Sequence, residues 1–294
     1  MLLPRFDYQE PQTVTEALDM MASFKDKAKI LAGGTDLLVN LKRGLVETRE
    51  VVSVHRLKGL TGIKPMKTGL KIGPLTTAAQ LAASGADLGR ASVLAAAAAR
   101  LGSPLIRNRA TVGGNLVTAR PASDMAPPLM ALGAKVVLSR QGGRRTVELD
   151  QYFQGPGLTV INPDEILTSI VIPPLEPGSG CGYLKLGIRK TLEIAMVNVA
   201  AFLTLDGQGT ISQARIVLGA VGPTPLRAKI AESLLVGERP KGPNDPILVG
   251  AGLAAVNDAR PIDDHRGSAE YRRLMVETLT RRALAQAWRQ AEEG

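Results

Sequence analysis

The segments ILAGGTDLL (Ile30–Leu38) and ATVGGNLVTARPASD (Ala110–Asp124) decide the interpretation of this 294-residue sequence. Each holds a glycine pair at the point where an apolar run ends and a new element begins. Glycine lets the backbone approach a ligand closely and adopt positive φ, so that successive N–H groups can surround a phosphate. Two such turns predict two backbone cradles that close on one extended, doubly phosphorylated ligand, a dinucleotide.

In the first segment, Gly33-Gly34-Thr35-Asp36 lies between a predicted strand and a predicted helix. The start of a helix favours negative charge, which adds to the backbone donors. Thr35 offers a hydroxyl donor, and Asp36 can cap the helix. Taken alone, this segment is better interpreted as an ordinary strand-to-helix turn.

The second segment adds polar side chains to its glycines, in Thr111-Val112-Gly113-Gly114-Asn115. Thr and Asn can bond a phosphate or a ribose. Asp124 is a candidate for accepting hydrogen bonds from ribose hydroxyls, although it can also cap a helix over 125–132. Arg107 and Arg109 lie just upstream, where they can neutralise phosphate charge or form a solvated loop face.

Two other nucleotide-binding patterns are missing from both segments. Neither contains the G-x-G-x-x-G of a Rossmann turn or the G-x-x-x-x-G-K-[ST] of a P-loop. The kind of cradle therefore favours FAD over NAD bound on a Rossmann turn.

Composition places the chain among ordinary globular proteins of about two domains, with 45% hydrophobic residues. No apolar run approaches the ~18 residues of a membrane span, and the first ten residues do not resemble a signal peptide. We therefore expect a cytoplasmic protein.

The single cysteine, Cys181, excludes an internal disulfide and an iron–sulfur cluster held by this chain. The two histidines are too few for a typical histidine-based metal site, so no metal site is predicted.

The formal net charge of +9 is compatible with nucleic-acid binding. However, Lys and Arg are scattered and aromatic residues make up only 3%, so no stacking platform for bases is expected. Attraction to an anionic cofactor or to acidic partner subunits is the preferred explanation.

Hydrophobic periodicity and turn residues predict alternating strands and helices in the first part of the chain. Thr13 and Glu16 form a capping box. The expected elements are a helix from Val14, a strand Lys29–Leu31, a helix Leu37–Arg43, strands Val51–Val54 and Leu70–Ile72, a helix from Thr76, an alanine-rich helix Ser92–Leu101, a hairpin of Lys135–Ser139 and Thr146–Leu149 around a turn Gln141–Arg145, and a strand Glu165–Ile172.

A linker is expected at Leu175–Gly182, because Pro and Gly punctuate it. The pattern then changes to strands followed by helices, which is typical of a separate α+β domain. The predicted domains are 1–176 and 177–294. The expected elements of the second are strands Tyr183–Ile188, Val197–Leu205 and Ile211–Leu218, and helices near Leu226–Leu235, Ile247–Asn257 and Tyr271–Ala291.

Together these segments resemble the FAD-binding medium subunit of the molybdenum hydroxylases, the family of xanthine dehydrogenase and aerobic carbon monoxide dehydrogenase. The resemblance extends over nearly the whole chain. It rests on Leu3–Tyr8, the two glycine segments, Glu165–Leu167, Lys185–Ala200 and the ending Asp263–Arg273. It implies a fold of the vanillyl-alcohol-oxidase and p-cresol-methylhydroxylase type: two α/β subdomains that hold FAD, plus a C-terminal α+β domain of the CO dehydrogenase flavoprotein type.

The resemblance also implies which residues bind the cofactor. Lys29 to Asp36 would wrap the pyrophosphate from one side and Ala110 to Asn115 from the other, while Lys185 would approach the flavin ring. Without the resemblance, Lys185 is interpreted as a solvated strand lysine and Ile194 as core. The implied FAD-binding set is Lys29, Ile30, Leu31, Ala32, Gly33, Gly34, Thr35, Asp36, Leu101, Ala110, Thr111, Gly113, Gly114, Asn115, Thr118, Ser123, Asp124, Ile166, Lys185 and Ile194.

The function implied is electron transfer within an oxidoreductase of several subunits. Electrons would pass from the [2Fe–2S] clusters of a small subunit, supplied by a large molybdopterin subunit, through FAD to NAD⁺, a quinone or oxygen. No side chain of this chain need act as acid, base or nucleophile. The alternatives are a stand-alone flavin reductase of the same fold, similar to the reductase of peptidoglycan-precursor synthesis, and a nucleotide- or nucleic-acid-binding module.

Overall fold

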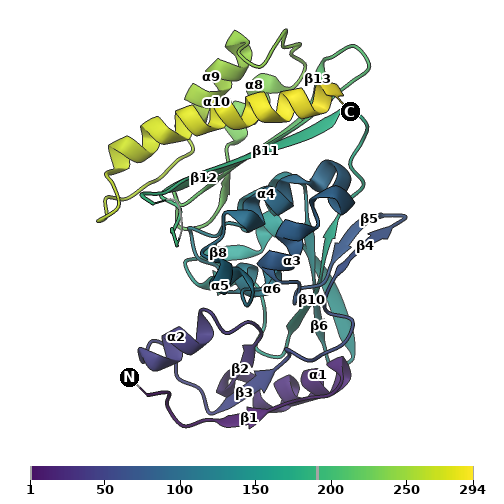
Figure 1. The fold of residues 1–294 in the computed structure, drawn as a ribbon, viewed down its shortest axis with the longest axis vertical. Coiled ribbons are helices and arrows are strands. Elements are labelled where there is room, and N and C mark those ends of the chain that lie inside the picture. Colours follow the sequence, from purple (N-terminus) through teal and green to yellow (C-terminus); the bar gives the residue numbers. More distant parts are fainter. Residues whose placement is uncertain (1, 190–191, 294) are drawn as a thin grey trace.

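The structure is a computed structural model that describes residues 2–189 and 192–293. Three layers are stacked along the long axis of the molecule, and each is built around its own β-sheet (Figure 1). The first two layers come from the N-terminal part of the chain and the third from its C-terminal part. The predicted fold class, two α/β subdomains followed by an α+β domain, is confirmed.

The first layer is a parallel sheet of three strands in the order β1-β3-β2. Its long helix begins where the sequence predicts, since the Thr13 side chain accepts a hydrogen bond from the Glu16 N–H at 3.1 Å. Ala17 and Met21 lie on the apolar face of this helix and are buried in the core. The elements are β1 (Asp7–Gln9), α1 (Val14–Phe24), β2 (Ala28–Leu31), α2 (Leu37–Lys42) and β3 (Glu50–Ser53).

The second layer is an antiparallel sheet of five strands in the order β4-β5-β10-β6-β7, covered by short helices. The alanine-rich helix lies inside it with Ala97 and Ala98 fully buried, because small side chains let its neighbours approach. The elements are β4 (Ile63–Met66), β5 (Gly69–Ile72), α3 (Ala78–Ala83), α4 (Val93–Ala99), α5 (Pro104–Arg107), α6 (Val112–Val117), α7 (Ala126–Ala131), β6 (Lys135–Arg140), β7 (Gly143–Glu148), β8 (Phe153–Gly155), β9 (Leu158–Thr159) and β10 (Ile166–Ile172).

The third layer is an antiparallel sheet of four consecutive strands with three helices. Every residue of its second strand is buried, because one face of the sheet packs on α10 and the other on α4 and α7. The side chains alternate accordingly between two separate cores. The elements are β11 (Ser179–Leu186), β12 (Val197–Leu205), β13 (Ile211–Gly219), β14 (Leu226–Arg227), α8 (Lys229–Leu235), α9 (Pro246–Ala255) and α10 (Ala269–Glu293).

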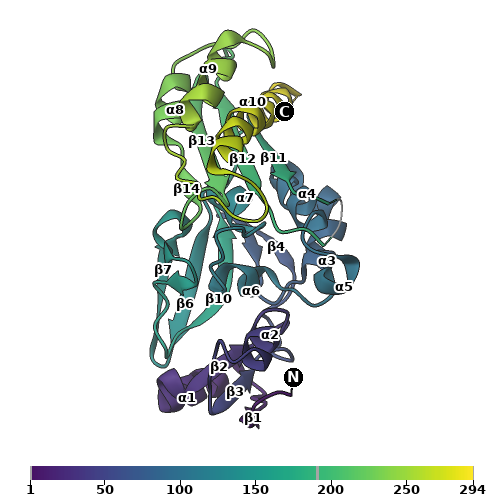
Figure 2. The same ribbon diagram turned by 90° about the vertical axis from the view of Figure 1, so that its left-hand side faces the viewer.

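Helix α10 is 25 residues long and crosses the outer face of the third sheet (Figures 1 and 2). Its exposed positions include Arg273, Arg281, Arg282 and Arg289. No helix in the described part of the chain is both long and apolar enough to cross a membrane.

The expected linker Leu175–Gly182 is wrong in its second half, where β11 already begins at Ser179. Gly180 and Gly182 lie in this strand beneath α10. A Cβ atom on Gly180 would clash with the carbonyl oxygen of Ala287, and one on Gly182 with that of Ala283. These glycines therefore allow a helix to approach a strand closely, a role that a local pattern does not distinguish from loop punctuation.

Other differences are local. The helix predicted to begin at Thr76 begins at Ala78, with Thr77 as its cap. The hairpin turn is shorter than predicted, because β7 begins at Gly143. The sequence did not predict α6 over the second glycine pair, nor β4.

Candidate cofactor site

The first glycine segment forms a turn with free backbone donors. Gly34 has φ +78°, and its carbonyl oxygen accepts a hydrogen bond of 3.2 Å from the Leu38 N–H. Among the described residues, none accepts a hydrogen bond from the backbone N–H of Gly33, Gly34, Thr35 or Asp36. Gly33 to Thr35 are only partly buried. Four consecutive donors at an accessible turn are the arrangement that holds an anion.

The structure brings the two glycine segments together, although they are far apart in sequence. A Cβ atom on Gly33 would clash with the carbonyl oxygen of Arg109 and lie 3.3 Å from the Cα of Ala110. Only glycine fits at this contact. The predicted pairing of the two segments is therefore a feature of the fold.

The second segment differs from the predicted glycine nest, because Gly113 and Gly114 lie in helix α6 and have no positive φ. Its first N–H groups bond within the chain: Val112 to the Thr76 carbonyl, Gly113 to the Pro74 carbonyl and Gly114 to the Thr111 hydroxyl, at 2.8–3.0 Å. This side of the predicted cradle is thus a capped helix start packed on the loop before α3.

Asp36 does not cap α2, contrary to one expectation. It occupies the N-cap position without a side-chain hydrogen bond. Its backbone has φ −104° and ψ −50°, whereas a capping side chain requires an extended residue. Its side chain remains exposed beside the turn.

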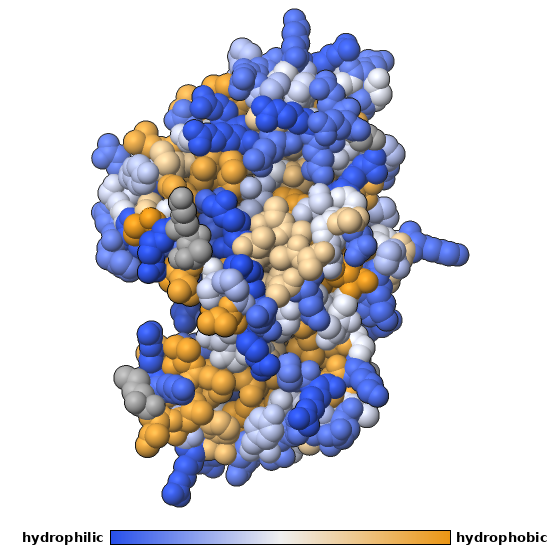
Figure 3. Space-filling view, in the orientation of Figure 1, coloured by the Kyte–Doolittle hydropathy of each residue, from blue (hydrophilic) through white to orange (hydrophobic). Residues whose placement is uncertain are grey.

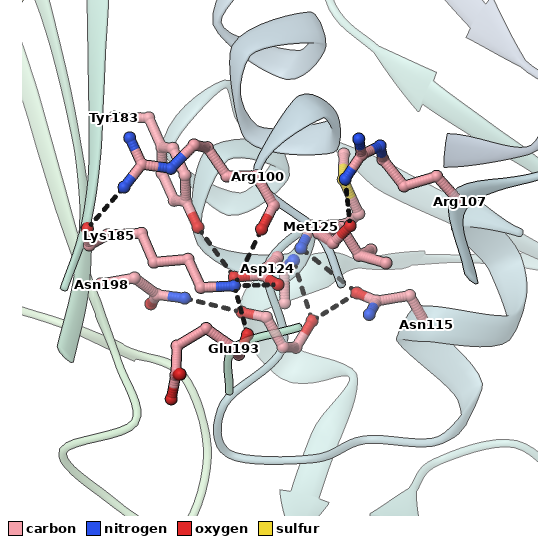
Figure 4. Close-up of polar contacts among 12 residues, drawn as sticks. Arg100, Arg107, Asn115, Asp124, Met125, Tyr183, Lys185, Glu193 and Asn198 are labelled. Carbon is pink, nitrogen blue, oxygen red and sulfur yellow. Dashed lines mark hydrogen bonds and ion pairs between the residues drawn. The ribbon is translucent and has the colours of Figure 1, made fainter. Parts of the chain in front are cut away.

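Asp124 is likewise not the cap of the following helix, α7. The hydroxyl of Ser123 accepts the N–H of Ala126 at 3.1 Å instead. The Asp124 carboxylate accepts hydrogen bonds from the Tyr183 hydroxyl at 3.1 Å and from the Lys185 ammonium at 2.7 Å (Figure 4). Both of its oxygens therefore have partners in the chain, and a ribose contact of Asp124 stays a prediction.

Lys185 is buried, so its interpretation as a solvated strand lysine is wrong. Only 8% of the residue is exposed. Its Nζ donates to Asp124 at 2.7 Å, to the carbonyl of Glu193 at 2.9 Å and to the carbonyl of Arg100 at 3.0 Å. Three acceptors match the three donors of an ammonium group.

Burial shapes the electrostatics around this pair. It raises the pKa of the Asp124 carboxyl, and the charge and hydrogen bond of Lys185 oppose that rise. Burial, together with the Asp124 charge, raises the pKa of the Tyr183 hydroxyl well above its ordinary value. Tyr183 is therefore a neutral donor to the Asp124 carboxyl.

Asn115 ties the second glycine segment to this pair. Its side-chain oxygen accepts the Ser123 hydroxyl at 2.6 Å and the Met125 N–H at 3.2 Å. The Asn198 side chain donates to the Ser123 carbonyl at 3.0 Å. A hydrogen-bonded path thus runs from the second glycine segment to the third layer (Figure 4).

Sequence reasoning missed Tyr183, Asn198 and Arg100. Asn198 carried a usable signal, because it is a polar residue inside the apolar run VNVAAFLTL. The Arg100 side chain donates to the Lys185 carbonyl at 3.1 Å, so each residue bonds the backbone of the other. This reciprocal pairing depends on tertiary contact and leaves no local pattern.

The remaining predicted residues lie around the two segments in different environments. Thr118 donates to the Gly114 carbonyl at 2.8 Å. Ile194 is 58% exposed, so its interpretation as core is wrong. Arg107 bonds the Leu101 carbonyl, while Arg109 is exposed. Lys29 is exposed, Ile30, Leu31 and Ala32 are partly buried, and Leu101, Ala110 and Ile166 are buried.

Comparison with known proteins decides the family. Residues 4–175 match the model of the FAD binding domain in molybdopterin dehydrogenase. The chain belongs to the FAD-binding medium subunits of the molybdenum hydroxylases. Residues 183–287 match the CO dehydrogenase flavoprotein C-terminal domain. This medium subunit is thus a component of an oxidoreductase, and its cofactor is FAD.

Relatives match the medium subunit along its whole length. The carbon monoxide dehydrogenase medium chain of Hydrogenophaga pseudoflava is 34% identical over 98% of this chain and 99% of the relative. The xanthine dehydrogenase FAD-binding subunit of Escherichia coli is 31% identical, over 95% of each chain. The solved carbon monoxide dehydrogenase of H. pseudoflava superimposes with a TM-score of 0.92 at 33% identity, covering 99% of both chains.

The residues of the medium subunit fit this cofactor. The turn Gly33–Asp36 offers free N–H groups for a pyrophosphate, and Gly33 admits the second segment against it without a side chain between them. When bound, FAD supplies redox chemistry that no side chain has, since it can exchange electrons singly and in pairs.

Proposed function

We propose that the medium subunit relays electrons, by way of its FAD, from the [2Fe–2S] clusters of a small partner subunit to NAD⁺, a quinone or oxygen. A large molybdopterin subunit would oxidise the substrate and feed the clusters. Cys181, the one cysteine of the sequence, is buried, so this chain has no thiolate set for a cluster of its own. We propose the cytoplasm as its compartment.

The observation that carries the proposal is the turn Gly33–Asp36 packed against the backbone of Arg109 and Ala110. On this basis we assign the pyrophosphate to the first turn, with the second segment beside it. The twenty residues that the family resemblance assigns to FAD remain our proposed contact set. Lys185 is proposed to lie beside the flavin ring, where a cation favours the reduced, more negative flavin.

The surface supports assembly with partners. An apolar area covers the first layer around α2 (Figure 3). Val39 and Leu45 of this region are 42% and 66% exposed. Contiguous exposed apolar surface is typical of protein–protein contact.

We also propose that the boundary between the FAD-binding and C-terminal domains lies between residues 176 and 177.

A stand-alone flavin reductase is the less favoured function. The relative that matches nearly the full length of this chain is named a carbon monoxide dehydrogenase medium chain, which favours the function of a subunit. A chain that oxidised NADPH on its own with a specific organic substrate would favour the reductase.

The acceptor is tested with the three subunits co-expressed and purified together. The complex is reduced by its substrate without oxygen, then mixed with NAD⁺, a soluble quinone or oxygen while flavin absorbance is followed. Fast reoxidation by one of them identifies the acceptor. A flavin that the substrate does not reduce in an intact complex would contradict the proposed electron path.

A further inference from the structure

A buried ion pair lies where the third layer meets the second. Lys185 comes from β11, and Asp124 lies between α6 and α7 beside the second glycine segment (Figure 4). Their side chains are 3% and 8% exposed, and 2.7 Å separates Nζ from Oδ2. The pair is therefore part of the boundary that holds the C-terminal domain against the FAD-binding part of the chain.

Stability alone is a weak reason for such a pair. Removing two charges from water costs much of what their attraction returns, and apolar replacements often fold as well. In this protein, both charged groups also form further hydrogen bonds with the chain. Tyr183 occupies the second carboxylate oxygen, and two carbonyls complete the shell of the ammonium. The charges are thus held at fixed positions in a poorly screened interior.

We propose that Asp124 and Lys185 form one electrostatic unit whose net charge sets the reduction potential of the flavin. Asp124 is the positioning residue of this unit, because it fixes the Lys185 ammonium and offsets part of its field. The inference rests on the proposed function, which places Lys185 beside the flavin ring. Arg100 is the other cation in contact with Lys185, and since it stays constant in every variant below, its contribution cancels.

The charges of the pair give different expectations for the two single variants. The wild-type ion pair has no net charge, and Asp124→Asn leaves one positive charge. In Lys185→Met, burial favours the uncharged carboxyl of Asp124, so the ammonium is lost without a negative charge in its place. Adding an electron to the flavin is favoured by positive charge nearby. The potential should therefore be highest in Asp124→Asn, whereas Lys185→Met and the double variant, which both lack the ammonium, should share a lower value.

The experiment is a spectroelectrochemical titration of bound FAD in the purified complex for these four proteins. Asp150→Asn, at an exposed position in the second layer, is the matched control for loss of a carboxylate and should leave the potential unchanged. FAD content and thermal unfolding are measured in parallel.

A potential above wild type in Asp124→Asn, with Lys185→Met and the double variant equal to each other and below Asp124→Asn, supports the proposal. A potential in Asp124→Asn that is not above wild type, or no shift beyond that of the control in any variant, overturns it, because a purely structural pair would only weaken FAD retention. If Lys185→Met does not fold, Asp124→Asn decides the question by a potential above or not above wild type. Failure of the proposed function is distinct, since the substrate would then not reduce the flavin of the intact wild-type complex, whatever its potential.

Discussion

At the scale of single residues, the backbone of Gly33–Asp36 matters more than any side chain. Gly33 has no room for a Cβ atom, and Gly34 adopts φ +78°, which side chains disfavour. The sequence identified this turn because glycine leaves a local pattern. The family resemblance assigned Lys185 to the site, whereas its local pattern did not place it in the interior, because Asp124, the partner that compensates its burial, lies far away in sequence.

Gly34→Ala should weaken FAD binding strongly while the protein still folds. The Cβ atom costs about 1 kcal/mol at positive φ and disturbs the row of free N–H groups. Gly142→Ala is the matched control, because Gly142 has φ +75° in an open hairpin turn. Equilibrium dialysis with FAD and thermal unfolding would compare them. Equal FAD affinity in both variants would remove the turn from the site.

Gly114→Val should remove FAD with little loss of fold. An added Cβ atom at this position meets only the Thr111 hydroxyl, at 2.8 Å, and Gly114 is partly exposed, so the change adds bulk at the surface of the segment. The flavin content of the purified variant is read from its absorbance spectrum. A folded variant with normal flavin content would show that the second segment does not contact the cofactor there.

At the scale of elements, sequence patterns succeeded for a continuous apolar run that ends at a turn and failed where packing is unusually close. The strand Val197–Leu205 was predicted with its observed bounds, because its mostly apolar run ends at the turn residues Asp206–Gly209. Gly180 and Gly182 were assigned to a linker, since nothing local reveals a helix lying on the strand. The start of α6 was missed because glycines seldom open a helix.

Gly182→Leu should destabilise the protein without a direct effect on FAD chemistry. The side chain would collide with the backbone of α10 at Ala283, and such overpacking costs about 3 kcal/mol. Urea unfolding measures the change, with Gly207→Leu in an open turn as the control. A midpoint unchanged from wild type would mean that α10 does not pack on β11 as described.

The segment before α10 should make stability depend on acid pH. Although burial opposes ionisation, hydrogen bonds from Arg266 and the charge of Arg272 hold the pKa of Asp264 well below its ordinary value. Arg272 also bonds the carbonyls of Met196 and Ala220, which ties α10 to the sheet. A depressed folded-state pKa stabilises the protein above the unfolded-state value, and this stability is lost as the pH falls through the folded-state value.

Asp264→Asn should therefore lower the free energy of unfolding at neutral pH. Its difference from wild type should shrink as the pH falls below about 4, where the unfolded-state carboxyl takes up its proton. Urea denaturation at a series of pH values measures this difference. A difference that stays constant down to strongly acidic pH would contradict the assigned role of the carboxylate.

At the scale of the whole molecule, the three layers are connected through the proposed site. The first glycine segment packs on the second, and the second is hydrogen-bonded to the third layer through the buried ion pair and its neighbours. The third layer contributes Tyr183, Lys185 and Asn198, which donate hydrogen bonds to Asp124 and Ser123 of the second glycine segment. The C-terminal domain is therefore in direct contact with the proposed cofactor site. The family resemblance predicted the two-part organisation. It did not predict this boundary, which depends on residues that are polar, buried and distant in sequence.

The most direct test of the account is a titration of the purified, flavin-stripped subunit with FAD and FMN, repeated with the co-expressed partners. Tight binding of FAD and much weaker binding of FMN are expected, because the proposed site holds a pyrophosphate. FAD contains this group, whereas FMN has a single phosphate. Loss of that preference in Gly34→Ala but not in Gly142→Ala would locate it at the turn. Equal affinity for FAD and FMN, or no flavin binding by the folded subunit with its partners present, would contradict the account.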